Sequence, residues 1–306
     1  MTRIVSIGEC MIELSGREGT TWRQGYAGDT FNTLWYLRAL SPRTAVTDYV
    51  TAFGDDPFSR EQIAFLAANG IGIASSPVIQ GLAPGLYAIT LDRNGERSFT
   101  YWRRDAAARR LADDHDALAE SLHGAGLLYF SGITLAILED RARDDLLSII
   151  ETARARDTVV AFDPNYRPRL WPDPGTARTA TRAGYAAASI VLPTFDDEQA
   201  LFGDATPRDT IERIRHQGPG EIVVKSGGRD ALVAVDMTMT PVPPPHAVEP
   251  LDTTGAGDSF NGAYLAARLA GQGPQDAARF AHGVAAMVIR HYGALLPMDR
   301  LTGLGP

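Results

Sequence analysis

From residue 127 to the end of the chain, short apolar runs alternate with helical patterns, and no other feature limits the possible folds so strongly. The apolar runs predict strands at residues 127–130, 158–162, 189–192, 221–224 and 231–235. Helical spacing of apolar residues is clearest at 140–156, 206–216, 256–270 and 274–291. Strands that alternate with helices usually join parallel neighbours through helical crossovers. The alternation therefore predicts an α/β fold with a mainly parallel sheet covered by helices.

The first part of the chain contains further elements of both kinds. Strands are predicted at 4–7, 11–15 and 50–53, and helices at 29–40 and 58–68. Asp29 or Thr30 is predicted to cap the first of these helices. Residues 86–91 and 98–103 alternate like the arms of a hairpin around Asn94-Gly95, a pair that tolerates the positive φ angles of a tight turn.

Together these elements predict one domain spanning residues 1–306, a large α/β body with a small β-sheet lid. The lid strands are expected at about 10–27 and 84–104. The proline-rich segment at 241–246 is predicted to be a loop or an edge strand and not a linker, because it leads directly into the richest motif of the chain. Exposed lid strands leave an edge free for pairing, so we expect a homo-oligomer, at least a dimer through the lid.

The composition excludes several classes of protein. The 306 residues carry a formal net charge of -8 without a basic run, which argues against binding to nucleic acid or to anionic membranes. The single cysteine, Cys10, rules out an intramolecular disulfide and any zinc site with two thiolates. No apolar stretch approaches the ~18 residues of a membrane span, and no signal peptide precedes the first strand. We therefore expect a cytoplasmic protein.

The segment LDTTGAGDSF at residues 251–260, followed by a helical pattern, carries the strongest chemical signal. Gly255 and Gly257 allow a tight turn whose N–H groups approach a ligand, and the helix points its positive end at the same place. Asp258 lies in the first turn of that helix. Phosphoryl transfer to an alcohol needs both features, because amides stabilise the transferred group and a carboxylate accepts the hydroxyl proton. A glycine turn capped by Asp258 is the structural alternative, but the full string favours the functional interpretation.

This string resembles the C-terminal signature of the ribokinase-like (PfkB) sugar kinases, and GYAGDTFNT at 25–33 resembles their N-terminal glycine–asparagine motif. Further segments are similar to those of the 2-keto-3-deoxygluconate kinases within that family: residues 7–15, 28–33, 84–87, 97–103 and 162–171. The resemblance implies a three-layer α/β/α body with a β-sheet lid, and ATP-dependent phosphorylation of 2-keto-3-deoxygluconate at its C6 hydroxyl. The alternatives are another sugar kinase of the family, such as a fructokinase or ribokinase, and a catalytically silent sugar-acid sensor.

Two arginines favour an acidic sugar as substrate. Arg103 ends the predicted hairpin, and Arg167 follows a strand, in a loop of the kind where open α/β sheets bind ligands. The planar guanidinium group forms paired hydrogen bonds with a carboxylate. Tyr101 projects from the same face as Arg103, and Tyr87 on the other arm of the hairpin could join them. Solvation of an arginine or packing of tyrosines across strands explains any one of these residues equally well.

The family resemblance assigns roles to individual residues. Asp258 is expected to be the general base, and the amides of Gly255, Ala256 and Gly257 to form the anion hole. The sugar acid is expected to contact Gly28, Asp29, Asn32, Tyr87, Tyr101, Arg103, Arg167 and Asp258. ATP is expected to contact Asn165, Arg167, Thr194, Lys225, Gly227, Gly228, Gly255 and Gly257. Lys225 is the only lysine of the chain, and a turn between two strands at this point is compatible with such a contact.

The same resemblance implies two kinds of bound cation. Family members use Mg²⁺ with ATP, and an acid of the motif Asn-x-x-Glu helps to organise it through water. Here Thr194 and Asp197 stand at the matching positions and Glu198 is adjacent, so either acid could serve Mg²⁺. Acids are also common in the first turn of a helix for stability alone. The family further allows a monovalent cation such as K⁺ near Asp252 and residues 290–294. No Walker GxxxxGK[ST] loop is present.

Overall fold

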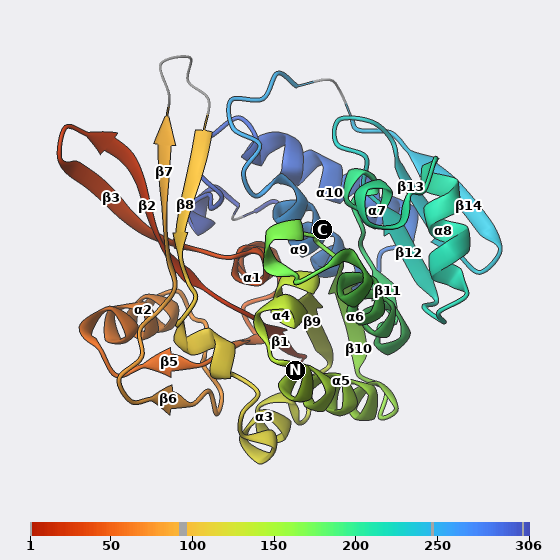
Figure 1. Ribbon diagram of the computed structural model, residues 1–306. Helices are drawn as coiled ribbons and strands as arrows, with labels where there is room; N and C mark the ends of the chain where they lie inside the picture. The colour runs from red at the N-terminus through yellow and green to blue at the C-terminus, as the bar shows by residue number, and fades with distance from the viewer. Residues whose placement is uncertain (1, 92–96, 246–247, 302) are drawn as a thin grey trace.

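The centre of the molecule is an eight-stranded sheet, seen in a computed structural model that describes all residues except 1, 92–96, 246–247 and 302 (Figure 1). Its strands are β1 Arg3–Ile7, β4 Val46–Val50, β9 Leu127–Ser131, β10 Val159–Asp163, β11 Ile190–Val191, β12 Glu221–Val224, β13 Ala231–Val235 and β14 Thr238–Val242. They follow the order β14-β13-β12-β11-β10-β9-β1-β4. Neighbours from β4 to β12 run parallel, whereas β13 and β14 add an antiparallel edge.

Helices cover both faces of this sheet and produce three layers. One face carries α3 His115–Leu122, α4 Gly132–Ile137, α5 Asp140–Arg154, α6 Pro174–Ala187, α7 Phe195–Phe202 and α8 Pro207–Arg215. The other carries α1 Asp29–Leu40, α2 Pro57–Ala68, α9 Ala256–Leu269 and α10 Pro274–Val288. Short 3₁₀ helices are η1 Ala107–Arg110, η2 Pro168–Leu170 and η3 Met298–Arg300. Each face has its own apolar core, since successive strand residues such as Leu128 and Tyr129 point to opposite faces.

The predicted α/β architecture is confirmed, because each strand and helix predicted beyond residue 127 is present. Strand β13 and helix α1 have the predicted bounds. The central strands were easy to recognise because they are buried on both faces: every residue of β9 and of β12 is buried, so these strands consist of nearly uninterrupted apolar runs. The segment at 241–246 begins within β14, an edge strand as predicted, and residue 246 lies outside the described residues.

The prediction of a strand at residues 50–53 was wrong. The structure has β4, which ends at Val50, and the short strand β5 Phe53–Gly54, which pairs with β6 Val78–Ile79. The hydrophobic pattern missed β4 because its middle residues, Thr47 and Asp48, are polar although buried. Arg3 on the neighbouring strand pairs with Asp48 at 2.8 Å, and this ion pair makes the burial of the acid tolerable.

Helix α1 also begins differently from the prediction. Its N-cap is Gly28, and neither Asp29 nor Thr30 caps it. The Thr30 hydroxyl instead bonds to a buried tyrosine hydroxyl at 3.0 Å, and Asp29 accepts a hydrogen bond from Asn165 at 2.8 Å. Position 28 has no room for a side chain, because a Cβ would lie 2.0 Å from the carbonyl oxygen of Glu9. The start of α1 therefore packs closely against the loop after β1 and frees Asp29 for a distant partner.

A second sheet forms the lid, which projects to one side of the body in Figure 1. Its strands are β2 Met11–Glu18, β3 Thr21–Ala27, β7 Leu86–Leu91 and β8 Arg97–Trp102, in the order β3-β2-β7-β8. Strands β7 and β8 are antiparallel and place Tyr87 opposite Tyr101, as the predicted hairpin requires. The predicted turn at Asn94-Gly95 lies outside the described residues. No helix in the described part of the chain is both long enough and apolar enough to cross a membrane.

Candidate active site

A large cleft lies between the lid and the carboxyl-terminal ends of the central strands. The loops after β10, β11 and β12 line it, together with the beginnings of α1 and α9 and the lid strands. This edge of a parallel sheet is where open α/β proteins bind ligands. The cleft has a volume of about 1830 Å³, larger than the ~300–1,000 Å³ usual for one small ligand. Two ligands can therefore lie in it side by side.

Most of the predicted site residues meet in this cleft. Those that line it are Gly28, Asp29, Asn32, Tyr87, Tyr101, Arg103, Asn165, Arg167, Thr194, Asp197, Lys225, Gly255, Ala256, Gly257 and Asp258. Three predicted residues do not line it: Glu198, Gly227 and Gly228. Gly227 and Gly228 form the exposed turn between β12 and β13, where Gly227 has a φ of 60°. The tight turn between β12 and β13 therefore explains why glycine stands at these two positions.

Helix α9 begins at the predicted anion hole. Its N-cap, Gly255, has a φ of 74°, a left-handed conformation that favours glycine. A Cβ there would also lie 2.8 Å from the carbonyl oxygen of Ala294. The first amides of a helix lack acceptors within the helix, and the helix dipole adds positive potential. The Ala256 amide donates to the Thr253 carbonyl at 3.2 Å, a bond that an anion at this amide would replace.

Asp258, in the first turn of α9, is suited to accept a proton near neutral pH. Asn32 of α1 donates its Nδ2–H to Asp258 Oδ2 at 2.8 Å and so holds the carboxylate in place. Desolvation, and after it the nearby Asp29 carboxylate, raises the pKa of Asp258 to about 7. Burial likewise raises the pKa of Asp29. A general base whose pKa lies near the working pH combines a useful ionised fraction with good basicity.

A buried polar cluster lies beside the anion hole. Lys225, in the loop after β12, donates from Nζ to Asp163 Oδ2 at 2.8 Å and to Asn261 Oδ1 at 2.9 Å. Asn261 Nδ2 donates in turn to Asp163 Oδ2 at 2.6 Å. Neither Asp163 nor Asn261 was among the residues predicted for the site. Asp163 lay within the segment FDPN, and Asn261 follows Asp258 by three positions on α9, so position alone could have suggested both.

The lid supplies aromatic rings and one arginine. The rings of Tyr87 and Tyr101 have centroids 5.6 Å apart. Arg103 forms an ion pair with Glu9, which lines the cleft and is only 2% exposed. Among the described residues, Glu9 Oε1 has no hydrogen-bond partner. Sequence reasoning missed Glu9, although an acid directly after the first buried strand was an available signal.

The other predicted arginine, Arg167, lies across the cleft beside α7. It donates from one nitrogen to both carboxylate oxygens of Asp197, at 3.3 and 3.2 Å. Burial raises the pKa of Asp197, and the Arg167 guanidinium partly offsets that rise. Both residues line the cleft. Asp197 is therefore the acid of the Thr-x-x-Asp motif that can reach a ligand or a metal ion bound there.

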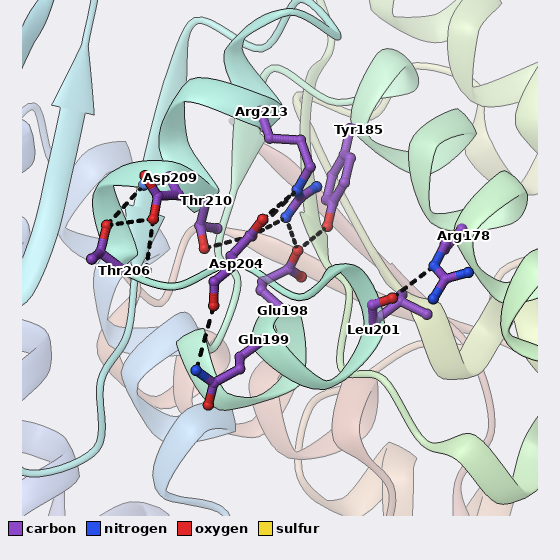
Figure 2. A network of polar contacts seen from close by, with 10 residues as sticks. All are labelled: Arg178, Tyr185, Glu198, Gln199, Leu201, Asp204, Thr206, Asp209, Thr210 and Arg213. Atoms are coloured by element: carbon purple, nitrogen blue, oxygen red, sulfur yellow. Dashed lines mark hydrogen bonds and ion pairs between the residues drawn. The ribbon is translucent and has the colours of Figure 1, made fainter.

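The adjacent acid, Glu198, does not line the cleft and instead lies in a separate network of polar contacts (Figure 2). Tyr185 donates its hydroxyl hydrogen to Glu198 Oε2 at 2.7 Å, and Arg213 donates to the same oxygen at 2.5 Å. Arg213 also pairs with Asp204 at 2.6 Å. Successive helical residues project about 100° apart around the axis, so Asp197 and Glu198 face different surroundings. The structure therefore favours Asp197 over Glu198 as the acid near a metal ion, because the Glu198 carboxylate belongs to a network between α6, α7 and α8.

One side chain connects the lid to the loop before the anion hole. Arg97 of β8 pairs with Asp252 and donates to the Thr254 hydroxyl at 2.9 Å. The Asp252 carboxylate also accepts the Gly293 amide at 2.6 Å. Although burial opposes it, hydrogen bonds led by that from Arg97 lower the pKa of Asp252. A monovalent cation at this carboxylate would have to displace the Arg97 guanidinium.

Comparisons with known proteins agree with this architecture. A family model described as pfkB family carbohydrate kinase matches residues 1–301. The chain is 38% identical to the 2-dehydro-3-deoxygluconokinase of Escherichia coli (strain K12), with 98% of each chain covered. It is 40% identical to that of Dickeya dadantii (strain 3937), with 97% of this chain and 98% of the other covered.

Solved structures share the fold at lower sequence identity. The crystal structure of 2-dehydro-3-deoxygluconokinase from Thermotoga maritima has a TM-score of 0.82 at 20% identity and covers 99% of both chains. A fructokinase with bound ATP from Xylella fastidiosa has a TM-score of 0.83 at 20% identity, covering 99% of this chain and 97% of that one. The ribokinase-like fold predicted from the sequence is confirmed.

Proposed function

Because the chain belongs to the pfkB family of carbohydrate kinases, we propose that it transfers the γ-phosphoryl group of ATP to the C6 hydroxyl of 2-dehydro-3-deoxygluconate (2-keto-3-deoxygluconate). The product is the 6-phosphate. The observation that carries this proposal is a carboxylate of raised pKa, Asp258, next to the glycine N-cap of α9 in a cleft whose lining includes Arg103 and Arg167. The two 2-dehydro-3-deoxygluconokinases to which the chain is similar are named for the same sugar acid.

The residues of the cleft divide the chemical work between them. Asp258 accepts the proton of the C6 hydroxyl as the hydroxyl oxygen bonds to the γ-phosphorus. The bond between that phosphorus and the bridging oxygen breaks, and ADP leaves with the electron pair. The amides of Gly255, Ala256 and Gly257 hold the charge of the transferred group. The lid covers the cleft and excludes water, which would otherwise accept the phosphoryl group.

The substrate's carboxylate is what distinguishes this proposal from a neutral-sugar kinase. Arg103 and Arg167 offer planar donors to it from opposite sides of the cleft, and Glu9 orients Arg103. The hydroxyl groups would contact Gly28, Asp29 and Asn32 on the body and Tyr87 and Tyr101 on the lid. ATP would lie toward Asn165, Thr194 and Lys225.

Magnesium is a further part of the proposal. Mg²⁺ bound with ATP would neutralise phosphate charge during transfer. Mg²⁺ prefers oxygen ligands and keeps several waters, with one or two carboxylates besides the phosphates. Asp197 fits that requirement, since its carboxylate lines the cleft. Among the described residues, no group of three or more His, Cys, Asp or Glu side chains could hold a metal ion, so the phosphates would supply the remaining ligands.

A substrate panel tests the proposed function. The purified protein is assayed with ATP and equal concentrations of 2-dehydro-3-deoxygluconate, fructose and ribose. We expect kcat/KM for the sugar acid to exceed that for either neutral sugar by at least 100-fold, about the effect of a charged hydrogen-bond pair. A preference for a neutral sugar contradicts the assignment. If no sugar is phosphorylated, the alternative of a catalytically silent sugar-acid sensor is favoured.

The proposal also covers the oligomeric state of the protein and its location in the cell. Strands β3 and β8 are the free edges of the lid sheet, and β8 exposes Phe99 and Trp102, which suit pairing with a second copy of the chain. We expect a homo-oligomer, at least a dimer through the lid, to be measured by light scattering after size exclusion. We also expect a cytoplasmic enzyme without nucleic-acid partners, in agreement with its net charge of -8.

A further inference from the structure

We propose that Lys225 is a catalytic residue whose ammonium group donates a hydrogen bond to the γ-phosphoryl group during its transfer. This inference rests on the proposed function and goes beyond a contact with the nucleotide. It states that Lys225 stabilises the transition state more than it stabilises bound ATP. Four observations support it: the burial of Lys225, the number of its donors in use, its distance from the anion hole, and the charges around it.

Lys225 is the only lysine of the chain, and its side chain is almost fully buried. A buried lysine needs a counterion and hydrogen-bond acceptors, because desolvation of an ammonium group is costly. Asp163 supplies the charge, at 2.8 Å. The backbone also fixes its position, since the Lys225 amide bonds to the Pro193 carbonyl at 2.8 Å and its carbonyl accepts from Phe195 at 2.8 Å. The Lys225 side chain is thus fixed at its backbone and at its ammonium group.

Two of the three ammonium hydrogens are already used. An ammonium group has three donors and no acceptor, and here two of them bond to Asp163 Oδ2 and Asn261 Oδ1, at 2.8 and 2.9 Å. Lys225 lines the cleft, so the third donor has a polar ligand within reach when the cleft is filled. Its Nζ lies 3.7 Å from the position that a Cβ on Gly257 would occupy. The ammonium group therefore lies next to the anion hole.

The surrounding charge favours such a donor. Three carboxylates, those of Asp29, Asp163 and Asp258, lie close enough to influence one another electrostatically, and Arg167 interacts with all three. Without positive charge nearby, these carboxylates would repel an entering triphosphate. Lys225 offsets part of this charge and lowers the pKa of Asp258 against the effects of burial and of the neighbouring acids. A compact ammonium group held in place before reaction needs no rearrangement as charge develops on the phosphoryl oxygens.

The same network fixes the donor relative to the base. Asn261 bonds to Lys225 and Asp163, and its Nδ2 also donates to the Tyr129 hydroxyl at 3.1 Å. Asn261 lies on α9, one turn after Asp258. The base, the anion-hole amides and the residue that orients Lys225 therefore belong to a single helix. In the proposed reaction Lys225 donates only a hydrogen bond, while the hydroxyl proton passes to Asp258.

Kinetics of matched variants test this role. Lys225→Met removes the charge and keeps the length of the side chain, and Arg229→Met removes an exposed positive charge from the same turn. We expect Lys225→Met to lower kcat by about 100- to 1,000-fold, the usual effect of losing one donor to a developing anion. KM for the sugar acid should stay within about threefold, and Arg229→Met should behave like the wild type. A raised KM for MgATP with kcat unchanged overturns the proposal, as does an equal loss of kcat in both variants.

A measurement on the unaltered protein covers the case in which Lys225→Met fails to fold. Protein grown with ¹³C-labelled lysine carries the label at one residue, so its Cε resonance reports on Lys225 alone. We expect this resonance to shift on addition of a non-hydrolysable ATP analogue and to shift much less with ADP. An equal shift with ADP, or none with either nucleotide, overturns the proposal. If another sugar is the better acceptor, the proposed function fails by itself, and the variants are then compared with that sugar.

Discussion

Two clusters of charged side chains, one in the cleft around Asp258 and one behind it around Glu198 and Arg213, differ in what they face. In both, burial raises the pKa of a carboxyl group to about 7: Asp258 in the cleft and Glu198 behind it. Each cluster also contains an arginine–glutamate pair, Arg103 with Glu9 in the cleft and Arg213 with Glu198 behind it. By pKa alone the two clusters would be equivalent candidates for catalysis.

Their surroundings separate them. Glu198 is fully buried, and Arg213, whose side chain is 21% exposed, is shared between it and Asp204 (Figure 2). Asp258 lines the cleft and has Asp29 as an electrostatic neighbour, an arrangement that costs stability and is useful only with a ligand present. The comparison shows that a raised pKa reports desolvation, and that access to a ligand decides whether the group can do chemistry.

The largest expected effect is that of Asp258→Asn. Loss of the general base should lower kcat by about 10³-fold or more. The asparagine oxygen can still accept from Asn32, and repulsion with Asp29 disappears, so the melting temperature should be unchanged or higher. Glu198→Gln is the matched control and should keep kcat within about threefold. Activity of Asp258→Asn near the wild-type rate would remove the distinction between the two clusters.

Arg213→Met should show the opposite behaviour, with a large effect on stability and little on catalysis. Removing Arg213 leaves Glu198 and Asp204 buried without their cation, which should lower the free energy of unfolding by about 3 kcal/mol. Urea denaturation measures this loss, and kcat is compared at a temperature where the variant is folded. A fall in kcat without a loss of stability would show that the cluster around Glu198 and Arg213 takes part in catalysis.

Arg103→Met tests the arginine on the cleft side. Since Arg103 is expected to bind the substrate's carboxylate, its loss should raise KM for 2-dehydro-3-deoxygluconate by about 10- to 100-fold, the range for a hydrogen bond to a charged group. KM for ATP should change little. Arg110→Met, which removes an exposed arginine from the neighbouring 3₁₀ helix, should match the wild type. Equal KM values for the sugar acid in both variants would make Arg103 a structural residue like Arg213.

The pH dependence gives the smallest and most specific effect. A carboxylate accepts a proton only when ionised, so kcat/KM should fall about tenfold per pH unit below the pKa of Asp258, about 7, and level off above it. Glu198→Gln should leave this profile unchanged. It should instead remove a component of the pH dependence of stability. The folded-state pKa of Glu198 exceeds its ordinary value, so this component favours folding at low pH and is lost as pH rises toward 7.

Much of the fold could be predicted because its signals are local. The apolar runs of β9 and β12 and the helical spacing of α9 reflect contacts that nearly every residue of those segments makes. Strand β4 was missed because its burial depends on an ion pair between Arg3 and Asp48, 45 positions apart. A hydrophobic pattern contains no information about such a pairing.

The residues of the candidate site likewise fall into those that local sequence predicts and those that it does not. The turn at Gly255 and the acid at Asp258 were predictable, because the conformation of a glycine N-cap and the dipole of the helix that follows are properties of consecutive residues. Glu9, Asp163 and Asn261 were missed although their positions offered signals, and what each of them does became visible only through partners far along the chain. Lys225 and Asp163, for example, are separated by 62 positions.

By itself the sequence determined an α/β body, a hairpin lid and a glycine turn that presents an acid to an anion, since periodicity and backbone conformation are encoded in neighbouring residues. The tertiary structure alone decided which acids can act. Asp197 and Glu198 are adjacent and chemically alike, yet one lines the cleft and the other is enclosed with Arg213. The physical reason is that solvation and counterions depend on which distant segments pack around a side chain, and a carboxylate takes its pKa and its accessibility from them.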